Sequence, residues 1–190
     1  MMRRSLVVVA GLAATTAGFG VGCSLETDLG STAIQVESDS PSTAQDLAAT
    51  VPTSADERAV VDRVVDGDTI MVELDGDIQR IRLIGIDAPE SVTPDVPQEC
   101  YGPEASAALS QLLPPGTEVW LESDQEPQDR FGRPLRYVYR GDDGLFINQW
   151  LTTHGFVESR SYPPNISRQD TLDAAELDAA DNDRGMWGNC

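Results

Sequence analysis

Three apolar, β-branched runs follow one another near the middle of this chain of 190 residues. The runs cover residues 59–65, 69–74 and 78–86, and Asp-Gly-Asp triplets at 66–68 and 75–77 separate them. Runs of this length and composition are typical of strands, and glycine readily takes the positive φ that a tight hairpin needs. The pattern therefore predicts three consecutive strands joined by tight turns.

The remainder of the chain alternates helical and extended patterns. We expect strands at 117–123 and 134–140, and helices at 103–113, 145–153 and 167–184. The prediction is an α+β fold, a five-stranded OB-type β-barrel with three helices. Barrels of this type commonly bind oligonucleotides or oligosaccharides, but a fold does not determine a function.

Residues 1–22 have the layout of a signal peptide, with two arginines, an apolar run and small residues before Cys23. The apolar run is shorter than the ~20 residues that a bilayer span needs. Gly-Val-Gly-Cys at 20–23 is similar to a lipobox, which predicts lipidation of Cys23. Simple secretion and a retained anchor are the two alternatives. Lipidation, simple secretion and a retained anchor all place the chain outside the cytoplasm, either at the outer face of the membrane or secreted from the cell.

The segment 23–57 is rich in Ser, Thr, Ala, Asp and Pro, and it has no sustained apolar periodicity. Such a composition predicts a disordered, acidic tether. The folded domain is then expected to span residues 58–190. Within it, Cys100 and Cys190 either pair in an oxidising compartment or remain thiols.

The net charge of −19 constrains any interaction with nucleic acid. All thirteen basic residues are arginines, and the chain has no lysine. A strongly acidic protein repels polyanions at long range, and salt screens that repulsion. We interpret the charge as a solubility feature or an adaptation to a salty habitat. A nucleic-acid site would then require a local arginine cluster, helped by a divalent cation.

Two acidic clusters are candidate cation ligands. Asp66 and Asp68 lie at the tip of the first turn, and Asp87 and Glu90 follow the third strand. Carboxylate oxygens suit Ca²⁺ or Mg²⁺. The alternative is that both clusters are solvated strand ends, since Asp-Gly-Asp is common in turns.

Two arginines are candidate phosphate ligands. Arg82 lies inside the apolar third strand, where a charge must point outward or meet a partner. Arg133 follows Phe131-Gly132 in a polar loop. A guanidinium group stays charged and binds phosphate in a bidentate manner.

Four segments in order, at 64–69, 81–90, 101–106 and 131–133, are similar to the successive motifs of the staphylococcal nuclease family. The resemblance covers residues 58–190. It implies an OB barrel and a Ca²⁺-dependent endonuclease acting on DNA and RNA, with Mg²⁺ or another divalent cation as the alternative. We expect a monomer.

The resemblance also assigns roles to individual residues. It implies that the metal ligands are Asp68, Asp87 and the main-chain carbonyl of Ala88, with Asp66 beside them. It implies that the catalytic residues are Arg82, Glu90 and Arg133. Phe131 and Arg160 stand where the family has tyrosines, which affects substrate affinity more than chemistry. The competing interpretations are a non-catalytic OB module that binds nucleic acid, protein or glycan, and an acidic structural protein.

Overall fold

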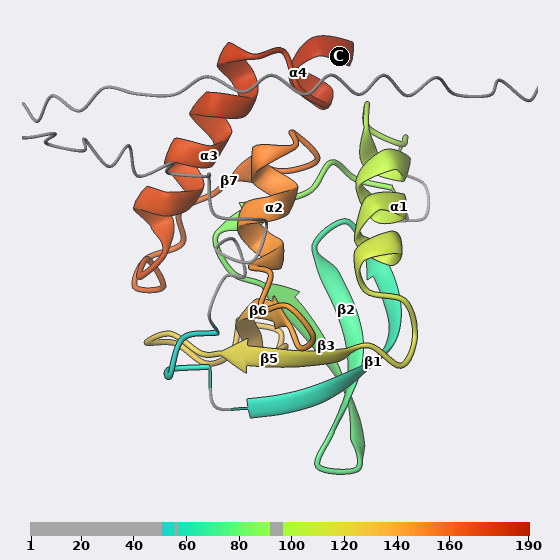
Figure 1. Ribbon diagram of the computed structural model, residues 1–190, viewed down its shortest axis with the longest axis vertical. Helices are drawn as coiled ribbons and strands as arrows, with labels where there is room; N and C mark the ends of the chain where they lie inside the picture. The colour runs from blue at the N-terminus through green and yellow to red at the C-terminus, as the bar shows by residue number, and fades with distance from the viewer. Residues whose placement is uncertain (1–50, 56, 92–96) are drawn as a thin grey trace, which may run out of the picture. The chain divides into compact units, whose positions relative to one another are not determined.

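Five strands close into a barrel in the order β1-β2-β3-β6-β5, as the sequence predicts (Figure 1). The computed structural model describes residues 51–55, 57–91 and 97–190. The predicted signal peptide, the lipidation site Cys23 and most of the predicted tether lie outside them. The barrel strands are β1 (Glu57–Asp66), β2 (Thr69–Leu74), β3 (Asp77–Leu83), β5 (Glu118–Glu122) and β6 (Leu135–Arg140).

The two predicted turns join β1, β2 and β3 into an antiparallel meander. Asp66 pairs with Thr69 across the first turn, and Leu74 pairs with Asp77 across the second. Asp75 and Gly76 both have positive φ, as the second hairpin requires. The barrel closes where β3 pairs in parallel with β6 and β5 pairs with β1.

The third strand is shorter than predicted, because the chain turns at Gly85. β3 ends at Leu83, and Gly85 has a φ of 76°. A side chain at Gly85 would also collide with Leu172, whose Cδ1 lies 2.5 Å from the position of a Cβ. The chain then enters β4 (Ile86–Asp87), which pairs with β7 (Glu158–Ser159) in a separate two-stranded sheet. This turn brings Asp87 back toward Arg82.

The three predicted helices are present, and a short fourth one ends the chain (Figure 1). They are α1 (Gly102–Leu112), α2 (Ile147–Thr153), α3 (Gln169–Asp181) and α4 (Met186–Asn189). Within the described ranges, none is long and apolar enough to cross a membrane. The buried Asn148 fixes α2 to the barrel, because its amide accepts a hydrogen bond from Val138 N and donates one to Ile84 O.

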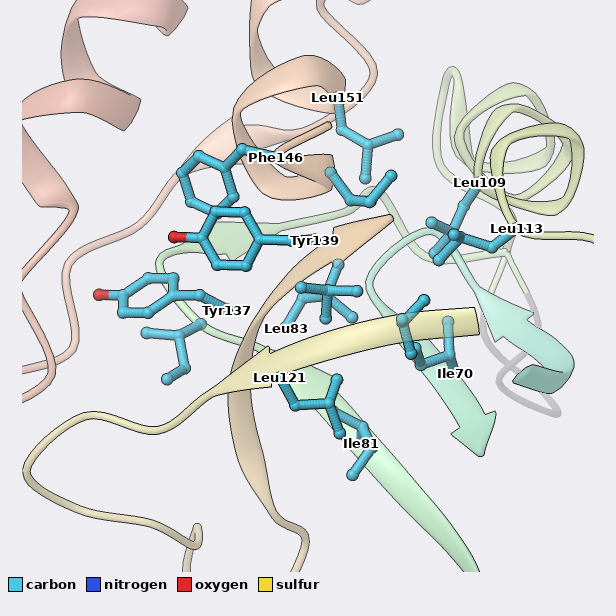
Figure 2. Close-up of a cluster of buried hydrophobic side chains, with 14 of the residues drawn as sticks. Ile70, Ile81, Leu83, Leu109, Leu113, Leu121, Tyr137, Tyr139, Phe146 and Leu151 are labelled. Atoms are coloured by element: carbon cyan, nitrogen blue, oxygen red, sulfur yellow. The ribbon is translucent and has the colours of Figure 1, made fainter. Parts of the chain in front are cut away.

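The core lies inside the barrel and continues under α1 and α2 (Figure 2). Ile70, Ile81 and Leu121 from three barrel strands are fully buried, as is Leu109 from α1. Each such side chain contributes about 1.5–3 kcal/mol of hydrophobic stabilisation. The core therefore supports the barrel end at which α1 meets the first turn.

The described residues just before β1 pack on the barrel. Ala55 is only 5% exposed, and the Ser54 hydroxyl donates a hydrogen bond to the Glu122 carboxylate at 2.6 Å. Burial of an apolar side chain and a hydrogen bond to a buried carboxylate both oppose local disorder. Ser54 and Ala55 therefore belong to the packed part of the chain.

A disulfide joins Cys100 to Cys190, 90 residues apart. Closing a loop of this length is expected to stabilise the fold by up to about 4 kcal/mol through the entropy of the unfolded chain. We predict that the double variant Cys100→Ser/Cys190→Ser unfolds at a lower urea concentration than the oxidised protein. The reduced parent is the control and is expected to match the variant. Equal midpoints for all three proteins would contradict the prediction.

Candidate active site

An open pocket of about 830 Å³ lies where the first turn, the end of β3, β4 and the 126–135 segment meet. The structure brings all seven sequence-predicted site residues to this pocket. They are Asp66, Asp68, Arg82, Asp87, Ala88, Glu90 and Arg133. Residues up to 67 positions apart in the sequence thus line one cavity. Two unrelated, solvated strand ends would not bring these side chains together.

The first turn buries the carboxylate of Asp68 instead of leaving it in solvent. Gly67 allows this, since a Cβ there would lie 2.7 Å from Ala88 Cβ and 2.9 Å from Ala105 Cβ. The Asp68 carboxylate accepts hydrogen bonds from Ala88 N at 2.9 Å and from the Thr69 hydroxyl at 2.9 Å. Asp66 in turn accepts a hydrogen bond from Asp68 N at 3.2 Å. The turn and the 87–90 loop are therefore held together through Asp68.

Arg82 links the two acidic clusters. One guanidinium nitrogen, Nη2, lies 3.0 Å from Asp68 Oδ2 and 2.9 Å from Asp87 Oδ1. The second terminal nitrogen, Nη1, donates to the carbonyls of Leu83 and Ile86, both at 2.9 Å, and so spans the turn after β3. The charge inside the apolar strand, unusual in the sequence, thus has two carboxylate partners.

The electrostatics of Asp68 favour an added cation. Burial raises the pKa of Asp68 to about 6, the Arg82 charge opposes this rise, and the Asp66 charge adds to it. A raised pKa in a buried carboxylate means that the positive charge nearby does not fully compensate the loss of hydration of the ionised form. A divalent cation at Asp68 and Asp87 would supply that charge.

The donor set fits a hard cation that keeps much of its water. No group of three or more acidic, histidine or cysteine side chains in metal-binding geometry occurs among the residues that the structure describes. Protein carboxylates would therefore supply two ligands, from Asp68 and Asp87, and the remainder would be the Ala88 carbonyl and water. Ca²⁺ and Mg²⁺ both accept carboxylate, carbonyl and water oxygens.

Glu90 is half-buried at the edge of the pocket, on the loop that follows β4. Its side chain accepts a hydrogen bond from Ser91 N at 2.9 Å. Its own main-chain N–H donates to the Glu99 carboxylate at 2.9 Å. The backbone of Glu90 is therefore fixed by contacts outside the pocket.

Arg133 is positioned by Asp129, a residue that the sequence analysis did not single out. Asp129 accepts hydrogen bonds from Arg133 Nε at 2.6 Å and from the main-chain nitrogens of Phe131 and Arg133, both at 2.9 Å. Burial alone would raise the pKa of Asp129, but these bonds outweigh burial and hold the pKa below its usual value. An aspartate three residues before a glycine is a turn pattern that could have revealed this role.

Four further residues add charge and aromatic surface to the site. Phe131 is 70% exposed, with the Arg130 guanidinium 4.6 Å from its ring centre. Arg160 Nη2 lies 3.4 Å from Asp87 Oδ2, and the exposed Tyr162 lines the same pocket. Four arginines line the pocket despite the acidic charge of the whole chain. This is the local arginine cluster that a nucleic-acid site on such an acidic chain requires.

Comparisons with known proteins show which family the chain resembles. The model of the family described as staphylococcal nuclease homologue matches residues 80–189. The chain is 39% identical over 131 residues to the thermonuclease of Staphylococcus intermedius, covering 69% of this chain and 76% of that protein. It is 39% identical over 127 residues to the thermonuclease of Staphylococcus hyicus, covering 67% and 73%. It is 32% identical over 129 residues to endonuclease YncB of Bacillus subtilis, covering 67% and 60%. The chain therefore belongs to the staphylococcal nuclease family of phosphodiester hydrolases.

Proposed function

We propose that this chain is a Ca²⁺-dependent endonuclease that hydrolyses DNA, RNA or both outside the cytoplasm. One observation carries the proposal: a single pocket contains two carboxylates suited to a cation, two positioned arginines and a third carboxylate at its edge. Phosphodiester hydrolysis needs these groups, because a water must lose a proton while charge builds on the phosphoryl oxygens.

In the proposed site, Asp68, Asp87 and the Ala88 carbonyl hold the cation. Asp66 keeps the first turn in shape through its hydrogen bond with Asp68 N. The cation would polarise a phosphoryl oxygen and lower the pKa of nearby water. Because Arg82 contacts both cation-binding carboxylates, its guanidinium also limits how far they can separate.

Glu90 is proposed to accept the proton of the attacking water, directly or through a second water. Arg82 and Arg133 are proposed to stabilise the negative charge on the phosphoryl oxygens. Arg133 is well prepared for this role, because Asp129 bonds its Nε and its main-chain N–H but not its terminal nitrogens. Preorganised donors of this kind cost little reorganisation during the reaction.

The proposed location is the outer face of the membrane, through a lipid on Cys23, with free secretion as the alternative. The support is the layout of residues 1–23 and the Cys100–Cys190 disulfide, since disulfides persist in oxidising compartments. We propose that the protein acts as a monomer.

The test is digestion of single-stranded DNA, duplex DNA and RNA by the full chain with Ca²⁺, with Mg²⁺ and with chelator. We expect internal cleavage with Ca²⁺ and none with chelator. Binding of nucleic acid without cleavage under every metal condition would instead support a non-catalytic module. Absence of both binding and cleavage by a folded protein would contradict a nucleic-acid function.

The acidic charge predicts an unusual dependence on salt. Basic nucleic-acid-binding proteins lose affinity as salt rises, because releasing the counterions condensed on the phosphates is less favourable at higher salt. Here the net charge of −19 repels the substrate, and salt weakens that repulsion at distances beyond about 10 Å at 0.1 M. We expect kcat/KM to rise as NaCl increases from low concentrations, before contacts at the pocket are screened. A monotonic fall in kcat/KM would contradict this expectation.

A further inference from the structure

Glu90 is attached to the residues that precede α1 by two reciprocal contacts. Its main-chain N–H donates to the Glu99 carboxylate at 2.9 Å. The main-chain N–H of Glu99 donates back to the Glu90 carbonyl at 2.9 Å. Together these bonds hold the peptide groups on both sides of the Glu90 Cα, and only one of the bonds depends on a side chain.

A close backbone contact supports the same arrangement. Gly102, the first residue of α1, donates its N–H to the Glu99 carbonyl at 3.1 Å. A Cβ at Gly102 would lie 2.6 Å from the Glu90 carbonyl oxygen and 3.0 Å from the Pro89 oxygen. The start of α1 therefore presses directly against the main chain that carries Glu90.

The disulfide fixes this region to the end of the chain. Cys100, next to Glu99, is bonded to Cys190, which directly follows α4. That helix is attached to the body through Met186 N, which donates to the Gly155 carbonyl at 2.9 Å. Both cysteines are exposed, beside an open pocket that Pro89, Glu99 and Trp187 also line. A reductant can therefore reach the bond.

We infer that Glu99, supported by the Cys100–Cys190 disulfide, is a positioning residue for Glu90. The inference rests on the proposed function, because it assumes that Glu90 acts in the reaction. A proton acceptor must stay within hydrogen-bond reach of the water it serves, and an error of about 1 Å can cost roughly 100-fold in rate. Glu99 would act through the Glu90 backbone and would not touch the substrate.

The disulfide also makes activity sensitive to reduction. Breaking the bond releases Cys100 from the end of the chain. Glu99, the residue before Cys100, is then held less firmly in place. Reduction is then expected to lower the same rate that the loss of the Glu99 carboxylate lowers. The two changes affect one arrangement, so their effects should not be additive.

The test compares Glu99→Ala, Glu99→Gln, Glu90→Gln and Cys100→Ser/Cys190→Ser in the full chain, with kcat and KM measured on single-stranded DNA at saturating Ca²⁺. We expect Glu99→Ala to lower kcat by roughly 10- to 100-fold with KM little changed. Glu99→Gln keeps an acceptor for Glu90 N and is expected to restore most of kcat. Glu104→Ala removes a nearby exposed carboxylate of α1 and serves as the matched control. In the cysteine double variant, Glu99→Ala should add little further loss.

The possible failures are distinguishable. Parent kcat in Glu99→Ala, together with a collapsed rate in Glu90→Gln, would overturn the positioning role and leave the proposed function standing. Unchanged cleavage in Glu90→Gln would overturn the role of Glu90, and the inference with it. A Glu99→Ala protein that loses kcat without rescue by Glu99→Gln would also contradict positioning through this hydrogen bond.

Discussion

The variant Arg82→Gln is expected to cleave nucleic acid roughly 100- to 1,000-fold more slowly than the parent, the usual cost of removing one donor to a developing oxyanion. The free energy of unfolding of the variant should also be lower than that of the parent. The Arg82 side chain is 12% exposed, and it is the ion-pair partner of Asp68, whose side chain is 10% exposed. Removing one member of a buried pair costs up to about 3–5 kcal/mol. Uptake of a proton by Asp68 would reduce that cost.

A second substitution separates the two effects. Arg82→Lys keeps the positive charge beside Asp68 and Asp87 but loses the planar fork that spans the turn after β3. We expect it to recover much of the stability and little of the rate. Cleavage rates and urea unfolding measure the two quantities, and Arg63→Gln, which removes an exposed arginine of β1, is the control. Parent-like cleavage by a folded Arg82→Gln would refute the catalytic assignment.

Asp68→Asn is expected to abolish cleavage while making the metal-free protein more stable. Burial raises the pKa of Asp68 from 3.8 to about 6, so the folded state favours the neutral carboxyl. The stability contributed by this group is present below pH 3.8 and is lost as the pH rises through about 6. At neutral pH the ionised Asp68 therefore destabilises the fold, by about 3 kcal/mol at most, at 1.4 kcal/mol per pKa unit.

Thermal unfolding with and without Ca²⁺ tests this prediction. The parent should gain about 2.7 kcal/mol when Ca²⁺ is at 100 times its Kd, and Asp68→Asn should gain little. Asp142→Asn, which removes an exposed carboxylate near the β6 end, is the control and should respond to Ca²⁺ as the parent does. A Ca²⁺-stabilised Asp68→Asn protein would place the cation elsewhere. A less stable metal-free variant would show that the pairing with Arg82 outweighs the burial of Asp68.

The barrel could be predicted from local sequence because its strands and turns are local features. The Asp-Gly-Asp turns and the β-branched runs specify β1 to β3 without long-range information. The end of β3 could not be predicted in this way, because residues 84–86 are as apolar as the strand before them. Contacts with Leu172 and Asn148, far along the chain, accompany the turn at Gly85.

For the candidate site, the sequence indicated the residues but not the contacts between them. Matching motifs identified Asp68, Asp87 and Arg82, but not that one guanidinium nitrogen contacts both carboxylates. Asp129 was missed because its role is visible only when the loop closes on Arg133. Local patterns thus identified the chemical groups, while their partners depended on tertiary contacts.

The most direct test of the account is the initial rate at which Glu90→Gln cleaves single-stranded DNA at saturating Ca²⁺, relative to the parent. Glutamine preserves the shape of the side chain and removes its ability to accept a proton, so Ca²⁺ binding at Asp68 and Asp87 should persist. We predict a rate at least about 100-fold below the parent, within the range typical of general-base catalysis. A rate equal to that of the parent would contradict the claim that this pocket carries out the hydrolysis through Glu90.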